Sequence, residues 1–312
     1  MQNVPESTVI VGLMVLMALT QIINHNFLSF ANITTMLKSI PFIALTGLGL
    51  SLTLIVGEVD ISVGRMAGLC GMVFGWMLMY EHWPLPLAML AGIVTGLICG
   101  TINAFLTVIV GVNSFVVTMG MLYIVGGIRY IINTGNAITL PDSYRSFSGQ
   151  TPGGISWFFW IVVGIFILIG FLESRTKFGR RMYAVGSNKE VAKLQGVNVT
   201  FIKMSAFILA GLFSGLAGVM AAIDLNSAQA PTGTGWEFRC VAACCIGGVT
   251  LGGGRGRAFG VAVGTFVVFV INNIINMMAI SNYYSDVFTG CILAGAVLID
   301  VLEKSKKIKA EA

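Results

Sequence analysis

Apolar runs of about twenty residues recur along almost the whole chain, and they decide what it can fold into. A membrane-spanning helix needs about 20 apolar residues to cross a hydrocarbon layer about 30 Å thick. Only 10% of the 312 residues are charged and 56% are hydrophobic, whereas a soluble domain carries about 25% charged residues. The runs do not alternate with polar residues as barrel strands do. The sequence therefore predicts an all-α, polytopic membrane protein.

We expect about eight to ten crossings in a single transmembrane domain covering residues 1–312. Residues 65–80 and 236–250 are short and bounded by glycine, so either run could be re-entrant or broken. The first run is expected to be a retained span, because no Lys or Arg precedes Lys38 and no cleavage site is evident. The expected spans are 8–24, 36–57, 65–80, 86–109, 113–133, 155–173, 204–223, 236–250, 257–279 and 284–302.

Positive charge is concentrated in two segments. The loop 174–203 holds seven of the 18 Lys and Arg residues, and the tail 303–312 holds four more. Loops rich in Lys and Arg stay on the cytoplasmic side of a membrane. We therefore expect both segments in the cytoplasm, with an even number of crossings between them, and the polar loop 134–154 on the outer face. The net charge of +5 follows this topology and does not indicate a nucleic-acid partner.

The sequence lacks the residue patterns of several kinds of catalytic, metal-binding and nucleotide-binding site. The six cysteines lie in apolar stretches without the spacing of a zinc or redox site. The sequence has two histidines and no H-E-x-x-H pattern, and the glycine-rich stretch 252–256 lacks the order of a phosphate-binding loop. We predict no catalytic residue, no metal and no cofactor bound by this chain.

An internal repeat links two short segments. Residues 56–65 read VGEVDISVGR and residues 246–255 read IGGVTLGGGR. Many transporters contain such repeats, with the transport path at the interface between them. The pattern leaves open whether the repeat is parallel or inverted. Chance similarity between glycine-rich membrane sequences is the alternative explanation.

Two acidic residues follow directly on an apolar run. A charge at the centre of a bilayer costs about 2.5–3.5 kcal/mol on insertion scales. Glu58 and Asp60 must therefore lie at the interface, line a polar path or pair with a cation, and Arg65 is the nearest cation in sequence. A structural turn held by the Asp60 carboxylate and direct contact with a substrate both remain possible.

Asparagines inside the later spans are the candidates for a translocation path, because an amide can hydrogen-bond a hydroxylated solute. Buried amides also hydrogen-bond neighbouring membrane helices, which is the alternative role. The i, i+4 spacing places Asn272 and Asn276 on one helix face. The four candidates are Asn103, Asn113, Asn272 and Asn276.

The motif VGEVDISVG at 56–64 resembles the G-x-[IV]-D-[LI]-S-V-G signature of ribose-type ABC importer permeases. The resemblance covers about residues 30–303 and is strongest from FGRRMYAVGSNKEVAKLQGVNV, at 178–199, onward. It marks Gly57, Asp60, Ser62 and Gly64 as the family's turn. It implies a subunit of a monosaccharide importer in the bacterial inner membrane, in contact with membrane lipid.

The resemblance also implies protein partners. These are a cytoplasmic ABC ATPase, which binds the ATP and Mg, a periplasmic sugar-binding protein, and a second permease copy or a paralogue. The family's E-A-A-x-x-x-G coupling element is matched by Glu190, Ala192 and Gly196, while Val191 departs from it. Arg180 belongs to the same segment. Asn188 is a good N-cap, so we expect a short helix over 189–195 that stops at Gly196.

Other solutes and other mechanisms remain alternatives. A nucleoside, an autoinducer-type solute or a polyol would suit the same kind of importer. A secondary transporter would need no ATPase. A membrane enzyme would need a nucleophile, base or metal cluster that the sequence does not display.

Overall fold

The computed structural model describes residues 6–142 and 154–278, together with 284, 287, 289–291, 294 and 295. Within these residues the chain is predominantly helical, with one small two-stranded sheet, and six helices are long and apolar enough to cross a membrane. The prediction of an all-α membrane protein is therefore confirmed. The six are α2 (Phe30–Ile55), α4 (Leu85–Ala104) with its π-helical end η1 (Phe105–Ile109), α5 (Ser114–Ile131), α6 (Trp157–Arg175), α9 (Val199–Asp224) and α11 (Ala258–Met277).

Five further helices lie within residues 6–278 of the described part of the chain. Of these, α1 and α3 coincide with expected spans, and α10 covers the first part of another. The expected span 284–302 and the tail 303–312 lie largely or wholly outside the described residues. The shorter helices are α1 (Glu6–Ile23), α3 (Val63–Met79), α7 (Lys177–Ser187), α8 (Lys189–Leu194) and α10 (Trp236–Ile246).

Two helices begin earlier than the apolar runs predict. Helix α2 begins at Phe30 because Ser29 Oγ accepts a hydrogen bond from Asn32 N at 3.3 Å. Helix α9 begins at Val199 because Asn198 Oδ1 accepts one from Phe201 N at 2.9 Å. A prediction based on the length of apolar runs misses these first turns, because polar residues follow both N-caps.

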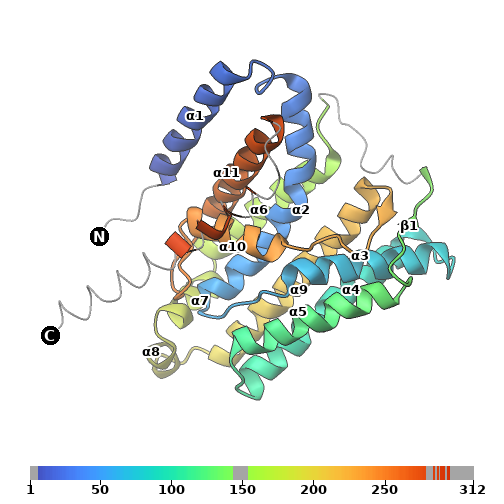
Figure 1. The fold of residues 1–312 in the computed structure, drawn as a ribbon. Helices are drawn as coiled ribbons and strands as arrows, with labels where there is room; N and C mark the ends of the chain where they lie inside the picture. Colours follow the sequence, from blue (N-terminus) through green and yellow to red (C-terminus); the bar gives the residue numbers. More distant parts are fainter. Residues whose placement is uncertain are drawn as a thin grey trace.

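Helices α2 and α9 form the centre of the bundle. Every residue of α2 from Ile40 to Ile55 is buried, and α9 packs against α2, α3 and α4. Glycines allow the closest approach: a Cβ added to Gly96 of α4 would lie 2.3 Å from the carbonyl oxygen of Gly211 in α9. Small residues of this kind drive helix packing in membranes. Helix α1 packs against α11 at one side of the bundle (Figure 1).

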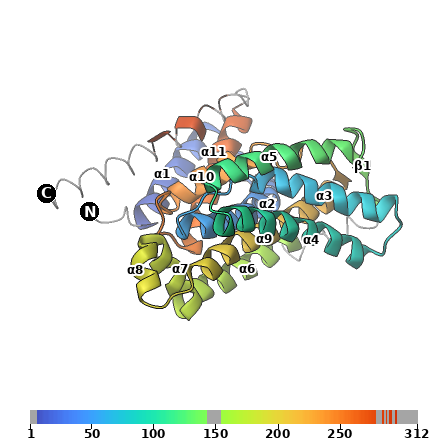
Figure 2. The ribbon, with the colours of Figure 1, turned by 90° about the horizontal axis from the view of Figure 1, so that it is seen from below.

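The basic loop and the described start of the polar loop, residues 134–142, lie at opposite ends of the molecule, as expected from their charge. Figures 1 and 2 show α7 and α8 at one end and β1 at the other. Strand β1 (Ile138–Thr139) pairs antiparallel with β2 (Ser227–Ala228), so the loop after α5 is tied to the loop after α9.

Helix α10 is a half-length helix inside the bundle. It has 11 residues and is about 16 Å long, too short to cross a membrane. Its first turn lies against the start of α3, since a Cβ added to Gly64 would lie 2.8 Å from Glu237 N and 2.7 Å from the oxygen of Gly233. Of the two runs for which a re-entrant or broken helix was possible, 236–250 is helical only as far as Ile246, whereas 65–80 is helical as far as Met79, in the uninterrupted helix α3. Helix α3, at 17 residues, is also shorter than the six long helices.

Candidate functional site

Helices α7 and α8 contain the residues predicted to form the coupling element, and we call residues 177–196 the coupling segment. Thr176 Oγ1 caps α7 by accepting from Gly179 N at 3.2 Å. Asn188 Oδ1 caps α8 by accepting from Glu190 N at 3.0 Å and from Val191 N at 3.1 Å. Gly196, with a φ of +77°, follows the end of α8, and a glycine in this conformation is a common helix stop. The predicted short helix is confirmed, and it ends one residue early, at Leu194.

The outer surface of α8 is available to another molecule. Ala192 is only 1% exposed and packs into the core, whereas Leu194 is 88% exposed. Glu190 and Arg180 are also exposed. Val191 is also exposed, at 47%, so α8 presents two large apolar side chains three residues apart, which are neighbours on one helix face.

The two repeat segments contact each other beside the coupling segment. We call residues 56–62 the first repeat turn and residues 247–257 the second repeat turn. Gly254 N of the second turn donates a 2.9 Å hydrogen bond to the oxygen of Ile55, next to the first turn. A Cβ added to Gly186 of α7 would lie 1.8 Å from that oxygen and 2.6 Å from Gly254 N. Only a glycine fits between the two turns at this point.

A tyrosine adds a second link between α7 and the second repeat turn. Tyr183 is half-buried, and its hydroxyl donates to the oxygen of Gly256 at 2.8 Å. Burial raises the pKa of the Tyr183 phenol, so the hydroxyl keeps its proton and can donate at neutral pH. The sequence identified the repeat and the coupling segment separately and did not predict their contact.

The first repeat turn is held by a buried polar network. Asp60 Oδ1 accepts from Ser62 N at 2.9 Å and from Ser62 Oγ at 2.6 Å. Asn103 Nδ2 of α4 donates to Asp60 Oδ2 at 3.2 Å and to Ser62 Oγ at 3.0 Å. All three side chains are fully buried. This geometry favours the structural role for Asp60 over direct contact with a substrate.

Helix α5 holds the same turn from another side. Ser114 Oγ accepts from Val59 N and Thr118 Oγ1 accepts from Ile61 N, both at 3.3 Å. Asn113, a predicted path residue, instead caps α5 by accepting from Phe115 N at 3.0 Å. Gly57, at the start of the turn, has a φ of +80°, which glycine adopts without strain.

Arg65 does not pair with either acidic residue of the turn. Glu58 forms an ion pair with Lys203 of α9. Arg65 Nε instead lies 3.9 Å from Glu237 Oε1 at the start of α10, and its guanidinium lies 5.5 Å from the ring centre of Tyr123. The suggestion that Arg65 pairs with Glu58 or Asp60 was wrong. The actual partners, Lys203 for Glu58 and Glu237 for Arg65, are distant in sequence and become neighbours only in the fold.

A buried arginine, Arg129 of α5, binds the loop before α10. Arg129 of α5 is 2% exposed. Its Nη1 donates to the oxygen of Thr232 at 2.8 Å and its Nη2 donates to Thr234 Oγ1 at 2.7 Å. Sequence reasoning did not select Arg129 or Glu237, although each is a charge within an apolar run, which is itself a signal of function.

The predicted path asparagines do not form one cluster. Asn103 is part of the first repeat turn and Asn113 is a helix cap, as described above. Asn272 donates to the oxygen of Val268 in its own helix at 2.7 Å, and Asn276 is exposed. Their neighbour Asn273 exchanges two 2.9 Å hydrogen bonds with Asn32 of α2. A path role for the four asparagines stays a prediction.

Known proteins with similar sequences agree on the class. The autoinducer 2 import system permease protein LsrC of Photorhabdus luminescens is 29% identical over 300 residues, which cover 96% of this chain and 90% of that protein. The ribose import permease protein RbsC of Escherichia coli K12 is 29% identical over 300 residues, covering 95% and 93%.

A family-level match extends over most of the chain. Residues 32–297 match the family described as branched-chain amino acid transport system / permease component. With the long apolar helices, this match makes the chain a multi-pass protein of the bacterial inner membrane and a transport subunit. The chain belongs to the branched-chain amino acid transport system / permease component family.

Proposed function

We propose that this chain is the permease subunit of an ATP-driven importer for a monosaccharide, a ribose-like pentose or a hexose. A cytoplasmic ATPase supplies the energy and a periplasmic binding protein delivers the solute. The observation that carries the proposal is the contact of the coupling segment with both repeat turns through Gly186. The similarity to RbsC, whose name specifies ribose import, supports the choice of solute.

In this proposal the coupling segment is the part of the permease on which conformational changes of the ATPase act. In this proposal α8 docks on the ATPase through Leu194 and its exposed neighbours, while ATP and Mg bind to the ATPase alone. Ala192 and the Asn188 cap fix α8 to the rest of the chain. A displacement of α8 would therefore move α7 with it, because the two helices are joined by a single residue, Asn188.

Movement of α7 would reach the short helices through the two repeat turns. The first turn leads into α3, and the second turn follows α10. Helices α3 and α10 also face each other at Arg65 and Glu237. A shift of both turns would change this contact and so alter access to a path on one side of the membrane at a time, as alternating access requires.

The side of the bundle that carries Arg65 and Tyr123 is our candidate for the translocation face. The Arg65 side chain is 25% exposed and Tyr123 is 68% exposed, although both belong to helices of the membrane bundle. Charged residues in such positions face a water-filled cavity or another protein rather than lipid. A guanidinium beside an aromatic ring offers hydrogen-bond donors and an apolar surface to a sugar. A second permease copy or a paralogue would close the path.

An uptake assay in vesicles can distinguish a monosaccharide from two other classes of solute. The LsrC relatives are named for autoinducer 2, and the family description names branched-chain amino acids. Uptake by vesicles that contain the permease, its ATPase and its binding protein should follow labelled ribose or a hexose and should require ATP. Uptake of autoinducer 2 or of leucine, without uptake of a sugar, would show that the transported solute is not a monosaccharide. Uptake without ATP would indicate a secondary transporter instead.

The docking role of α8 can be tested with a matched pair of variants. Leu194→Asp should abolish co-purification of the ATPase and ATP-driven uptake, while the permease still inserts, because the side chain is almost fully exposed. Gln195→Asp, also exposed in the next position, adds the same charge without removing the apolar group and should retain most of the activity. Normal ATPase binding by Leu194→Asp would contradict the proposal.

A further inference from the structure

Residues 228–235, from the end of β2 to the start of α10, follow the side of α3, and we call them the re-entrant segment (Figure 1). Two glycines of α3 mark its course. A Cβ added to Gly75 would lie 2.6 Å from the Ala228 side chain, and one added to Gly64 would lie 2.7 Å from the oxygen of Gly233. These glycines are separated by about three helical turns, or about 16 Å. The segment therefore extends through about half of a hydrocarbon layer about 30 Å thick.

The re-entrant segment is not helical over this depth. Hydrogen bonds of 3.1 Å from Thr232 N to the oxygen of Gln229, and from Thr234 N to the oxygen of Pro231, form successive turns. Pro231 and Thr234 are nevertheless exposed. Irregular backbone at membrane depth is found where it is buried in protein or lines a water-filled cavity, and not against lipid. The exposed side of the segment therefore faces water or a second protein chain.

Arg129 fixes the orientation of the Thr234 hydroxyl. The arginine is 2% exposed, and its Nη2 donates to Thr234 Oγ1 at 2.7 Å. A guanidinium N–H can only donate, so the threonine oxygen accepts this bond and its own proton points elsewhere. Among the described residues, that proton has no acceptor. The exposed hydroxyl is therefore a positioned donor that a solute can use.

The re-entrant segment lies beside the candidate translocation face. Glu237, three residues after Thr234, has its Oε1 atom 3.9 Å from Arg65 Nε. The segment also leads into α10, a half-length helix of 11 residues. Broken helices of this kind form the solute sites of many transporters, near the middle of the bilayer. The position of Thr234 thus suits contact with a solute that crosses the bundle.

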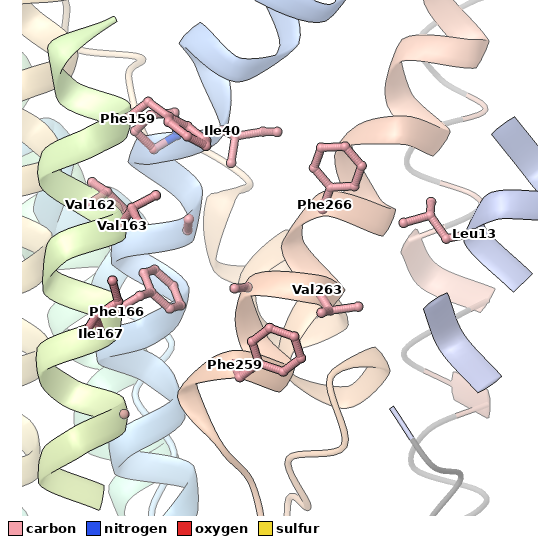
Figure 3. A pocket seen from close by; sticks show the side chains of 14 residues that line it. Leu13, Ile40, Phe159, Val162, Val163, Phe166, Ile167, Phe259, Val263 and Phe266 are labelled. Atoms are coloured by element: carbon pink, nitrogen blue, oxygen red, sulfur yellow. The ribbon is translucent and has the colours of Figure 1, made fainter. Parts of the chain in front are cut away.

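The cavity shown in Figure 3 offers no comparable group. It lies between α1, α2, α6 and α11 and has a volume of about 600 Å³. All 14 residues that line it are apolar or glycine, so their side chains form no hydrogen bond with a sugar. The Thr234 hydroxyl is therefore better suited to contact the solute than any side chain of this cavity.

We propose, on the basis of the function proposed above, that the re-entrant segment lines the translocation path and that the Thr234 hydroxyl donates a hydrogen bond to an oxygen atom of the sugar. Arg129 is a positioning residue, since it is buried and orients that hydroxyl. A single neutral hydrogen bond holds a solute loosely enough for its release on the other side of the membrane.

Accessibility of an engineered cysteine in the assembled importer tests the path. Cys245 and Cys291, the two cysteines that are not buried, are replaced by serine. Pro231→Cys is then treated with sulfonatoethyl methanethiosulfonate, an anionic reagent that does not cross lipid. We expect modification at a rate that changes about fivefold when vanadate traps the ATPase, because access to the path alternates. Leu168→Cys, at a 56% exposed apolar position of α6, is the matched control and should stay unmodified.

Two variants at position 234 test the contact with the solute. Thr234→Val keeps the shape of the side chain and removes the hydroxyl, whereas Thr234→Ser keeps the hydroxyl. ATP-driven uptake of the sugar is compared with uptake of each of its monodeoxy analogues. The preference for the sugar over one analogue should fall about fivefold in Thr234→Val, and Thr234→Ser should retain most of it. The binding protein is the same in every assay, so the change belongs to the permease.

Three results separate the possibilities. Lack of modification of Pro231→Cys in every state of the ATPase, in an importer that takes up the sugar, would overturn the path assignment. An unchanged preference in Thr234→Val would overturn the contact with the sugar, even if a lower unfolding temperature showed that Arg129 had lost its acceptor. A wild-type importer that takes up no sugar with ATP would contradict the proposed function instead.

Discussion

The hydroxyl of Tyr183 donates a 2.8 Å hydrogen bond to the carbonyl oxygen of Gly256, across 73 residues of sequence. This bond joins the coupling segment to the second repeat turn at a position where neither residue is part of a regular contact between long helices. It is a specific, directional link between the end that we expect to receive force and a turn that follows the half-length helix α10. A substitution that deletes a single atom, the hydroxyl oxygen, removes this link.

Tyr183→Phe should uncouple transport from ATP hydrolysis without unfolding the protein. The variant loses one hydrogen bond, about 1 kcal/mol, and leaves the Gly256 oxygen without that donor. We expect uptake per ATP hydrolysed to fall severalfold, measured in vesicles that contain the complete importer. Tyr80→Phe is the control, since the hydroxyl of the exposed Tyr80 makes a single hydrogen bond within the described residues, a long one of 3.5 Å with Asn133. Equal coupling ratios for the two variants would argue against the link.

Gly186→Ala should separate α7 from the repeat turns. Its new methyl group would meet the Ile55 oxygen at 1.8 Å and Gly254 N at 2.6 Å, so one of the backbones must move. Overpacking of this kind costs about 1–3 kcal/mol, and we expect a lower unfolding temperature together with loss of uptake. Gly164→Ala in α6, where nothing lies within 4 Å, is the matched control and should behave as wild type. An unaltered Gly186→Ala protein would show that α7 is not fixed there.

Asn103→Ala should destabilise the first repeat turn. It removes the donor to Asp60 Oδ2 and to Ser62 Oγ in a fully buried site. Leaving a buried acceptor without a hydrogen-bond partner costs about 1–3 kcal/mol. Denaturation of the purified permease would measure the loss. The double variant Asn103→Ala/Ser62→Ala should lose less than the sum of the two single variants, since both belong to one network. Strict additivity would count against that network.

The ion pair between Glu58 and Lys203 should tolerate exchange better than removal. Each side chain is only about 15% exposed, at 16% and 14%, so Lys203→Met leaves a poorly hydrated carboxylate and should reduce uptake and stability. The swap Glu58→Lys/Lys203→Glu restores opposite charges and should recover a substantial part of both. Reconstituted transport and unfolding temperature report the two effects. Failure of the swap to exceed the single variant would assign Glu58 a role beyond pairing.

Local features of the fold were predictable where the interactions that determine them lie within one short stretch of sequence. The length of the apolar runs predicts α4, α5, α6 and α11 closely. Glycine boundaries mark both 65–80 and 236–250 as candidates for a re-entrant or broken helix, and only the second has a helix that ends early, at Ile246. The Asn188 cap and the Gly196 stop predict α8 almost to the residue. In each case the determining interactions lie within a few residues of one another.

Long-range partners were not predictable in this way. The Glu58 partner lies 145 residues away in Lys203, and Arg65 approaches Glu237 rather than its neighbours. The asparagines illustrate the same difficulty: residue type suggests hydrogen bonding, but only packing decides whether the acceptor is Asp60, a helix end or Asn32. Sequence can identify a polar group in an apolar run, but it cannot identify the group opposite it.

The position occupied by Gly186 has a consequence for timing. Gly186 lies against the backbone of Ile55 and of Gly254, so a displacement of α7 at this point would act on both repeat turns together. Independent movement of one turn would require this contact to separate. A transport cycle built on this contact would move the two turns in one concerted step rather than one after the other.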